Sequence, residues 1–425
     1  MRLACSLIVL FALPAWSAGD GDDVIPITED MLGWSELAET LRKAEGAAAL
    51  DAAFQRLAAV GQNVSAAREA LQAVLAERWQ RNQGHLVKAK LDAKFKKLAA
   101  QREELDAARK FALTLIEDET AYFYPYNPPD VDPKKAAEYP KVQAEVDARV
   151  RAVLEVWTKS AKVKLAKPQL LLLEEQAWLW AHRESFAAPP VHDAALPEWA
   201  RWLPTGQETF ELRDWPLVPS EAAAMARDRA VSAYNETQWG ARSKPKHDRT
   251  EEEQLQIAQF PAEAEREQVR VTNEYRIMMG RPALTWDARL QASTRHHSDY
   301  MARTGEFGHN QNNAATRTPF QRMALAGYVG GVSENCAMGM SDPKAALESW
   351  KHSSGHHRNL LMRTHKQMAA AVTGNLWTQN FGVGPDGEKA MQAPAPTGSL
   401  SSYAGSCRPR APMGEQGMNE HQEQP

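Results

Sequence analysis

The sequence predicts a helical N-terminal region followed by an α+β domain, and three observations indicate this division. Apolar residues recur at three- and four-residue steps between residues 35 and 116, the spacing of amphipathic helices. Two strand-like runs, Met368–Thr373 and Leu376–Phe381, flank a Gly-Asn turn, a pattern typical of a β-hairpin. A charged, proline-containing stretch at residues 240–259 separates the two patterns, as expected of a domain boundary.

Length and charge narrow the class of protein. The chain has 425 residues, of which 24% are charged and 43% hydrophobic, a globular composition for two or three domains. The formal net charge of −4 gives no field that would attract nucleic acid or an anionic membrane surface. We therefore expect no nucleic-acid partner. C-terminal of the first residues, we expect no transmembrane segment either, because no stretch is long and apolar enough to span a bilayer.

The first residues have the three parts of an export signal. Arg2 precedes an apolar run from Leu3 to Leu13, and small residues follow at Ala15 and Ser17, as at a signal-peptide cleavage site. A run of this length is too short to cross a bilayer as an anchor. We therefore assign residues 1–17 to a signal peptide and expect a secreted or periplasmic protein.

Residues 18–239 are assigned to a helical domain. Helical periodicity extends to Ile116, is interrupted by an aromatic and proline-rich segment from Tyr122 to Pro140, and resumes from Val142 to Trp157. A further helical stretch follows Pro168. The lysine-rich run at residues 88–97 is interpreted as a solvated helix face, with an anionic wall polymer as the alternative partner.

The remaining segments are a linker, a second domain and a tail. Residues 240–263 form the linker, and residues 264–383 form the second domain. The tail at residues 384–425 is rich in Pro, Gly, Ser and Gln, so it should be disordered because it cannot bury enough apolar surface. After signal cleavage Cys336 and Cys407 remain, and their pairing is left open.

The second domain carries an ordered series of short motifs. They are Asn273-Glu274-Tyr275-Arg276, Leu284-Thr285-Trp286-Asp287, His297-Ser298-Asp299-Tyr300-Met301, Gly308-His309, Ala326-Gly327-Tyr328, Ser333-Glu334-Asn335, Trp350, Gly355-His356 and Trp377-Thr378-Gln379-Asn380-Phe381-Gly382. This succession resembles the bacterial branch of the CAP superfamily, the family of cysteine-rich secretory proteins. The resemblance implies an α-β-α sandwich with a small, largely antiparallel sheet, whereas periodicity alone indicates only an α+β fold.

The resemblance also implies a cavity lined by two histidines and two acids. His309 and His356 are similar to the two histidines, and Glu334 is similar to the first acid. Ser353 stands where the second acid is expected, three residues after Trp350, so that acid is absent or supplied differently. The resemblance also makes His357 a candidate for the cavity lining.

Outside this cavity, two further residues of the domain are candidates for a role. Glu348 is a weak substitute for the absent acid, because it precedes Trp350. His297 shares a helix face with Leu290 and Met301, so it is interpreted as a packed residue rather than a ligand.

Two imidazoles and a carboxylate could do three things. They could hold a divalent metal such as zinc, act as general acid and base, or form a hydrogen-bonded network that joins three loops. We therefore expect an exported protein that acts as a non-enzymatic binding module for a small apolar or lipid-like ligand, a cell-wall component or a protein partner. The alternative is a metal-dependent extracellular hydrolase centred on His309, Glu334 and His356.

Overall fold

A computed structural model describes residues 49–52, 75–123, 132–160, 162–182, 209–211, 214–240 and 261–384. The expected signal peptide, most of the expected linker, Cys407 and nearly all of the expected tail lie outside these residues. The contacts within the chain define two compact units. The first unit comprises residues 1–85 and 168–196, and the second comprises residues 86–167 and 197–425. No helix in the described parts of the chain is both long and apolar enough to cross a membrane.

The first unit is held together around helix α6, Lys167–Ala181, which confirms the helix expected after Pro168. Arg78 forms a buried ion pair with Glu175, with Nη1 and Oε1 2.8 Å apart. Trp178 donates a hydrogen bond from Nε1 to Asp51 Oδ1 at 2.8 Å. This unit contains none of the candidate site residues.

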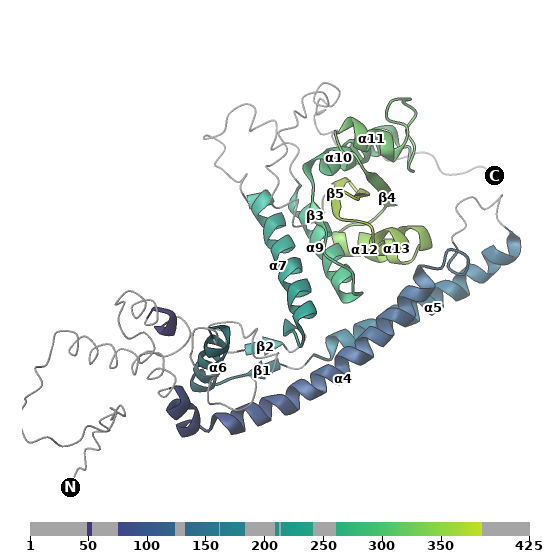
Figure 1. Ribbon diagram of the computed structural model, residues 1–425. Coiled ribbons are helices and arrows are strands. Elements are labelled where there is room, and N and C mark those ends of the chain that lie inside the picture. The colour runs from purple at the N-terminus through teal and green to yellow at the C-terminus, as the bar shows by residue number, and fades with distance from the viewer. Residues whose placement is uncertain are drawn as a thin grey trace, which may run out of the picture. The chain divides into compact units, whose positions relative to one another are not determined.

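In the described residues of the second unit, three helices precede the α+β part, and they confirm the helical character of this region (Figure 1). They are α4 (Gly84–Ile116), α5 (Pro133–Thr158) and α7 (Pro219–Gly240). Asp132 caps α5 by accepting a hydrogen bond from the backbone of Lys134, and Pro133 occupies the first helical turn. Two short antiparallel strands, β1 (Lys162–Lys164) and β2 (Thr209–Glu211), had no signal in the sequence.

The α+β part of the second unit follows α7. Its elements are α9 (Glu263–Met278), β3 (Thr285–Trp286), α10 (Ala288–Thr304), α11 (Pro319–Leu325), β4 (Gly331–Met338), α12 (Pro343–Lys351), α13 (Ser354–Leu361), β5 (Gln367–Thr373) and β6 (Leu376–Gly382). The strands form one four-stranded sheet in the order β3-β5-β6-β4. The short β3 is parallel to β5, and the other pairs are antiparallel. The expectation of a largely antiparallel sheet is therefore confirmed.

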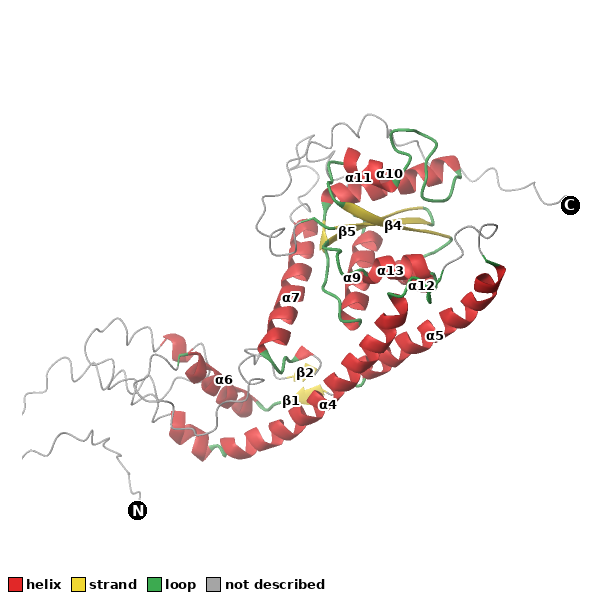
Figure 2. Ribbon diagram, turned by 45° about the vertical axis from the view of Figure 1, so that its right-hand side comes forward, coloured by secondary structure: helices red, strands yellow, loops and turns green. Residues whose placement is uncertain are grey.

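Helices cover both faces of this sheet, as Figures 1 and 2 show. Helices α10 and α11 lie on one face, and α9, α12 and α13 lie on the other. Between them, Trp377 and Phe381 of β6 are 1% and 0% exposed and belong to the main hydrophobic core. The α-β-α sandwich expected from the resemblance is thus present, with these aromatic side chains in its interior.

Strand β4, which carries Glu334, is an edge strand whose outer side is occupied by side chains. Asn359 of α13 donates a hydrogen bond to the carbonyl oxygen of Glu334 at 3.3 Å. Trp350 of α12 donates its indole N–H to the carbonyl oxygen of Cys336 at 3.1 Å. These two bonds tie the site-bearing strand to the helices beside it.

The preceding helices share their core with the sandwich. Leu105 of α4, Val146 of α5 and Trp239 of α7 belong to the same buried cluster as Trp350 and Trp377. The second unit therefore joins α4, α5 and α7 to the sandwich through apolar packing. The expected domain boundary at residues 240–263 stays a prediction.

Helix α7 is also joined to the sandwich by hydrogen bonds. Asn235 donates from Nδ2 to the carbonyl oxygen of Leu284 at 3.2 Å. Its Oδ1 accepts from the backbone N–H of Trp286 at 2.8 Å. The buried side-chain amide of Asn235 thereby binds the carbonyl of Leu284 and the N–H of Trp286, the two backbone groups that flank Thr285 at the start of β3.

Candidate functional site

The polar centre of the sandwich is the carboxylate of Glu334 on β4. This residue is 5% exposed, and its Oε1 lies 3.1 Å from Nδ1 of His309. Nη2 of Arg322 donates to Oε1 at 2.8 Å and to Oε2 at 2.7 Å. Burial by itself would raise the pKa of Glu334, but the bond to His309 and the charge of Arg322 outweigh it and hold the pKa below its ordinary value. The carboxylate is therefore ionised, and it accepts a hydrogen bond from Nδ1–H of His309.

Arg322, which supplies the countercharge, was not anticipated from the sequence. It lies on the seven-residue helix α11 and is 0% exposed. Its Nη1 also donates to the carbonyl oxygens of His309, Thr316 and Arg317 at 3.0, 3.1 and 3.2 Å. One guanidinium thus fixes both the carboxylate and the loop that carries His309.

Two of the three expected side chains meet directly, and the third lies beside them. The rings of His309 and His356 have centroids 6.1 Å apart and are tilted by 56°. His356 lies in the first turn of α13, and Asn335 of β4 donates to its carbonyl oxygen at 3.3 Å. Burial, with a smaller electrostatic contribution from His309, lowers the pKa of His356 to about 4. Its imidazole is consequently neutral at neutral pH.

His357 lies apart from this cluster, although it is the next residue in the chain. It is 1% exposed, and its Nε2 lies 2.6 Å from the hydroxyl oxygen of Tyr275. Its Nδ1 lies 3.4 Å from the hydroxyl oxygen of Tyr122, which follows α4. Burial lowers the pKa of His357 to about 3. The residue therefore joins α13 to α9 and to the end of the α4 segment, and does not line the cluster around Glu334.

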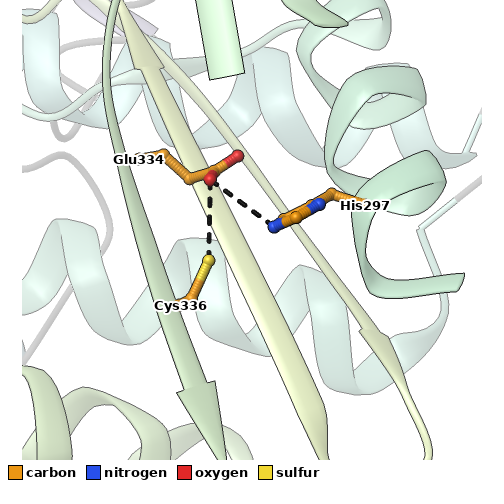
Figure 3. Close-up of side chains that lie close together, drawn as sticks. All are labelled: His297, Glu334 and Cys336. Atoms are coloured by element: carbon orange, nitrogen blue, oxygen red, sulfur yellow. Dashed lines mark hydrogen bonds and ion pairs between the residues drawn. The ribbon is translucent and has the colours of Figure 1, made fainter. Parts of the chain in front are cut away.

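His297 and Cys336 complete the surroundings of the carboxylate, as Figure 3 shows. Nε2 of His297 lies 3.7 Å from Glu334 Oε1 but only 2.7 Å from the carbonyl oxygen of Gly308. Its Nδ1 lies 2.8 Å from the side-chain nitrogen of Gln311. The carbonyl requires a hydrogen on Nε2, and Nδ1 accepts from the amide. Both nitrogens of His297 are thus engaged, in agreement with its interpretation as a packed residue.

Cys336 is a protonated thiol in this arrangement. Its Sγ lies 3.6 Å from Glu334 Oε1 and 3.6 Å from His309 Nδ1. Burial and the neighbouring charge of Glu334 raise the pKa of Cys336 well above its ordinary value. The thiol therefore donates weakly to the carboxylate, and it lacks the negative charge of a nucleophilic thiolate.

The donor set around Glu334 fits a divalent cation poorly. Ligand atoms of His297, Glu334 and Cys336 lie within 4.8 Å of one another, yet both nitrogens of His297 are engaged, with the carbonyl oxygen of Gly308 and the side chain of Gln311. Glu334 already faces the full charge of Arg322, which would repel a cation. The arrangement is better described as a hydrogen-bonded network that joins α10, α11 and β4.

The position of the expected second acid remains without a carboxylate. Ser353 precedes α13 and is 9% exposed. Glu348 forms an ion pair with Lys351 at 2.7 Å, and its side chain is 55% exposed. Glu348 is therefore engaged at the surface rather than with Glu334.

Comparison with known proteins identifies the sandwich. Two solved structures resemble part of the chain: an extracellular protein containing an SCP domain from Bacillus anthracis, with 28% identity over 33% of this chain and a TM-score of 0.28, and a cysteine-rich secretory protein from Staphylococcus aureus, with 22% identity over 28% of this chain and a TM-score of 0.24. The chain spans 45% and 40% of these two proteins, less than half of each. No curated protein matches it. Residues 269–381 match the model of the cysteine-rich secretory protein family, CAP, and this part of the chain is therefore a CAP domain.

Proposed function

We propose that this protein is an exported, non-enzymatic binding module whose CAP domain recognises a small apolar ligand, a cell-wall component or a protein partner. The observation that carries the proposal is the contact between Arg322 and both carboxylate oxygens of Glu334, at 2.8 and 2.7 Å. This contact compensates the only carboxylate of the cluster, so the polar centre stabilises the fold instead of performing chemistry.

The protonation states of the cluster support the same conclusion. A general base needs a pKa near the working pH, but His356, with a pKa of about 4, is a weak base. A nucleophilic cysteine needs a lowered pKa, and that of Cys336 is raised. Glu334 is held ionised by its partners and cannot act as a general acid.

A metal-dependent extracellular hydrolase is the second candidate, with His309, Glu334 and His356 as its centre. It is favoured by the proximity of the two imidazole rings, at 6.1 Å between centroids, and by the neutral state of His356, which a metal ligand requires. In this case the two histidines would hold the ion and would leave Glu334 to orient His309.

Zinc titration calorimetry distinguishes the two candidates. We expect no binding to the wild-type protein at about pH 7.5, where unperturbed imidazoles are neutral. We also expect no hydrolysis of casein or peptidoglycan, with or without chelator. Zinc binding that is lost in His309→Ala and in His356→Ala, but kept in His352→Ala, would refute the binding-module proposal in favour of the hydrolase. His352 is a suitable control because its side chain is 54% exposed and pairs with Asp147 instead of the cluster.

The proposal of export rests on the signal-like first residues, in which Arg2 precedes an apolar run and small residues follow it. We expect the mature chain to begin at Ala18. Intact-mass measurement of protein recovered from the culture medium or periplasm of a secreting host tests this, and a cytoplasmic product that retains Met1 to Ser17 would contradict it.

A further inference from the structure

A polar groove of ≈ 370 Å³ lies between α4 and the turn that follows α9, outside the Glu334 cluster. Its size falls in the range of small-molecule sites. Four of the ten residues that line it are cationic and two are acidic. The lining residues are Asp106, Arg109, Lys110, Leu113, Thr114, Glu117, Met279, Gly280, Arg281 and Arg363.

Two arginines form the fixed wall of this groove. Arg109 donates from Nε to the carbonyl oxygen of Met278 at 2.8 Å and from Nη2 to that of Ile277 at 3.0 Å. Gly280 ends α9 with a φ of 75°, a conformation that favours glycine, and the next residue, Arg281, donates from Nε to the carbonyl oxygen of Leu361 at 3.1 Å. The side chains of the two arginines are 17% and 9% exposed, so these guanidinium groups are held in place.

The two acidic residues of the groove neutralise the charges of these two arginines, and the other two cationic residues of the groove have no acidic partner in it. Asp106 pairs with Arg109 at 3.1 Å, and Glu117 pairs with Arg281. Lys110 and Arg363, both exposed, form no ion pair with any residue in the described ranges. The groove therefore carries an excess of two positive charges.

Capping of helix ends does not account for this excess. Helices α4 and α9 both end at the groove, and cations near helix C-termini are stabilising. This explains Arg109, which contacts the last carbonyls of α9. Lys110 lies well before the end of α4 at Ile116. Arg363 follows the end of α13 closely, but the last carbonyls of that helix accept hydrogen bonds from Arg276 and Arg281 instead.

We propose that this groove binds a small molecule that carries a phosphate monoester. Such a group has a charge of about −1.5 to −2 at neutral pH, which matches the two cations left over. The planar guanidinium group of Arg363 suits the geometry of phosphate oxygens, and the partly exposed Leu113 provides an apolar surface for the rest of the molecule. Bound phosphate would also relieve the repulsion between Arg281 and Arg363.

Calorimetric titration with glycerol 3-phosphate tests the proposal on the full mature chain at low ionic strength. We expect binding by the wild type, and binding about tenfold weaker in Lys110→Ala and in Arg363→Ala, because each removes a hydrogen bond to a charged group. Both side chains are exposed, so folding should be retained. Lys97→Ala is the matched control, since Lys97 is an exposed lysine on the same helix but outside the groove.

Three further measurements test the roles of ligand charge, ionic strength and the Glu334 cluster in this binding. Glycerol, which lacks the charge, should not bind, and added salt should weaken the binding of glycerol 3-phosphate. His309→Ala should leave it unchanged, so this site is tested independently of the proposed function. Absence of binding, equal binding by Arg363→Ala and the wild type, or equal weakening by Lys97→Ala would each overturn the proposal.

Discussion

Lowering the pH from about 7.5 to about 5 is expected to destabilise the second unit through its buried histidines. His297, His357 and His365 are 0%, 1% and 1% exposed. Burial is the largest cause that lowers their pKa values, to about 4, 3 and 3. In the unfolded chain the same side chains have a pKa of about 6.5. Below about pH 6.5, the unfolded state therefore binds more protons than the folded state.

The sign and size of the effect follow from these pKa values. The stabilisation is complete above about pH 6.5 and is lost as the pH falls toward the folded-state pKa values. A pH of about 5 lies about 1.5 units below the unfolded-state pKa of these histidines. At ~1.36 kcal/mol per unit, each histidine therefore lowers the free energy of unfolding by ~2 kcal/mol. For three residues the loss is roughly 6 kcal/mol, against a total free energy of unfolding of about 5–15 kcal/mol for a typical domain.

Urea unfolding at both pH values measures this loss of free energy. Hydrogen–deuterium exchange of peptides that cover β5 and β6 reports the unfolding of the second unit in these experiments. His357→Gln keeps a side chain able to bond Tyr275 and Tyr122 but removes the titration, so it should reduce the pH-dependent loss by about a third. His352→Gln, at an exposed position, should leave the loss unchanged. An equal free energy of unfolding at both pH values, or an unaltered loss in His357→Gln, would refute the reasoning.

Three other substitutions test the packing described above, each by urea or thermal unfolding of the second unit. Arg322→Met should cost about 3–5 kcal/mol because it removes the countercharge of the buried carboxylate of Glu334 and leaves it only its contact with His309, and adding Glu334→Gln should recover part of this; additive losses would contradict the pairing. Trp377→Ala should cost about 3–5 kcal/mol as a core deletion, and an unchanged midpoint would remove Trp377 from the core. Asn235→Ala should cost about 1–3 kcal/mol because it leaves the buried N–H of Trp286 without its partner, while the carbonyl of Leu284 keeps its bond from Asn273; wild-type stability would show that the hydrogen bonds of Asn235 do not hold α7 to the sandwich.

Most of the fold could be predicted because its signals are local or recur as motifs. Asp342 followed by Pro343 is a helix start that the sequence shows directly, and Asp342 does cap α12. The turn at Gly374 joins β5 and β6 as expected, and Gly374 has a φ of 63°. The strands β1 and β2 could not be anticipated, because three residues are too few for an alternating pattern to be recognised.

The site could be predicted only in part, because its countercharge has no local signature. An arginine on a short helix usually indicates a solvated face, so nothing in the sequence marks Arg322 as a buried partner of Glu334. The separation of His356 from His357 could have been recognised, since adjacent helical residues point in different directions. Helical periodicity at α13 thus allows only one of the two histidines to face Glu334.

The occupied outer side of β4 limits the addition of a strand from a second copy of this protein. An exposed edge strand is a template on which another chain can add a strand, leading to fibrils or domain swapping. Here the carbonyls of Glu334 and Cys336 already accept hydrogen bonds from Asn359 and Trp350, and an irregularity between Gly331 and Ser333 disrupts the regular register at the start of the strand. The CAP domain thus resists edge-to-edge aggregation through the same strand that positions its polar cluster.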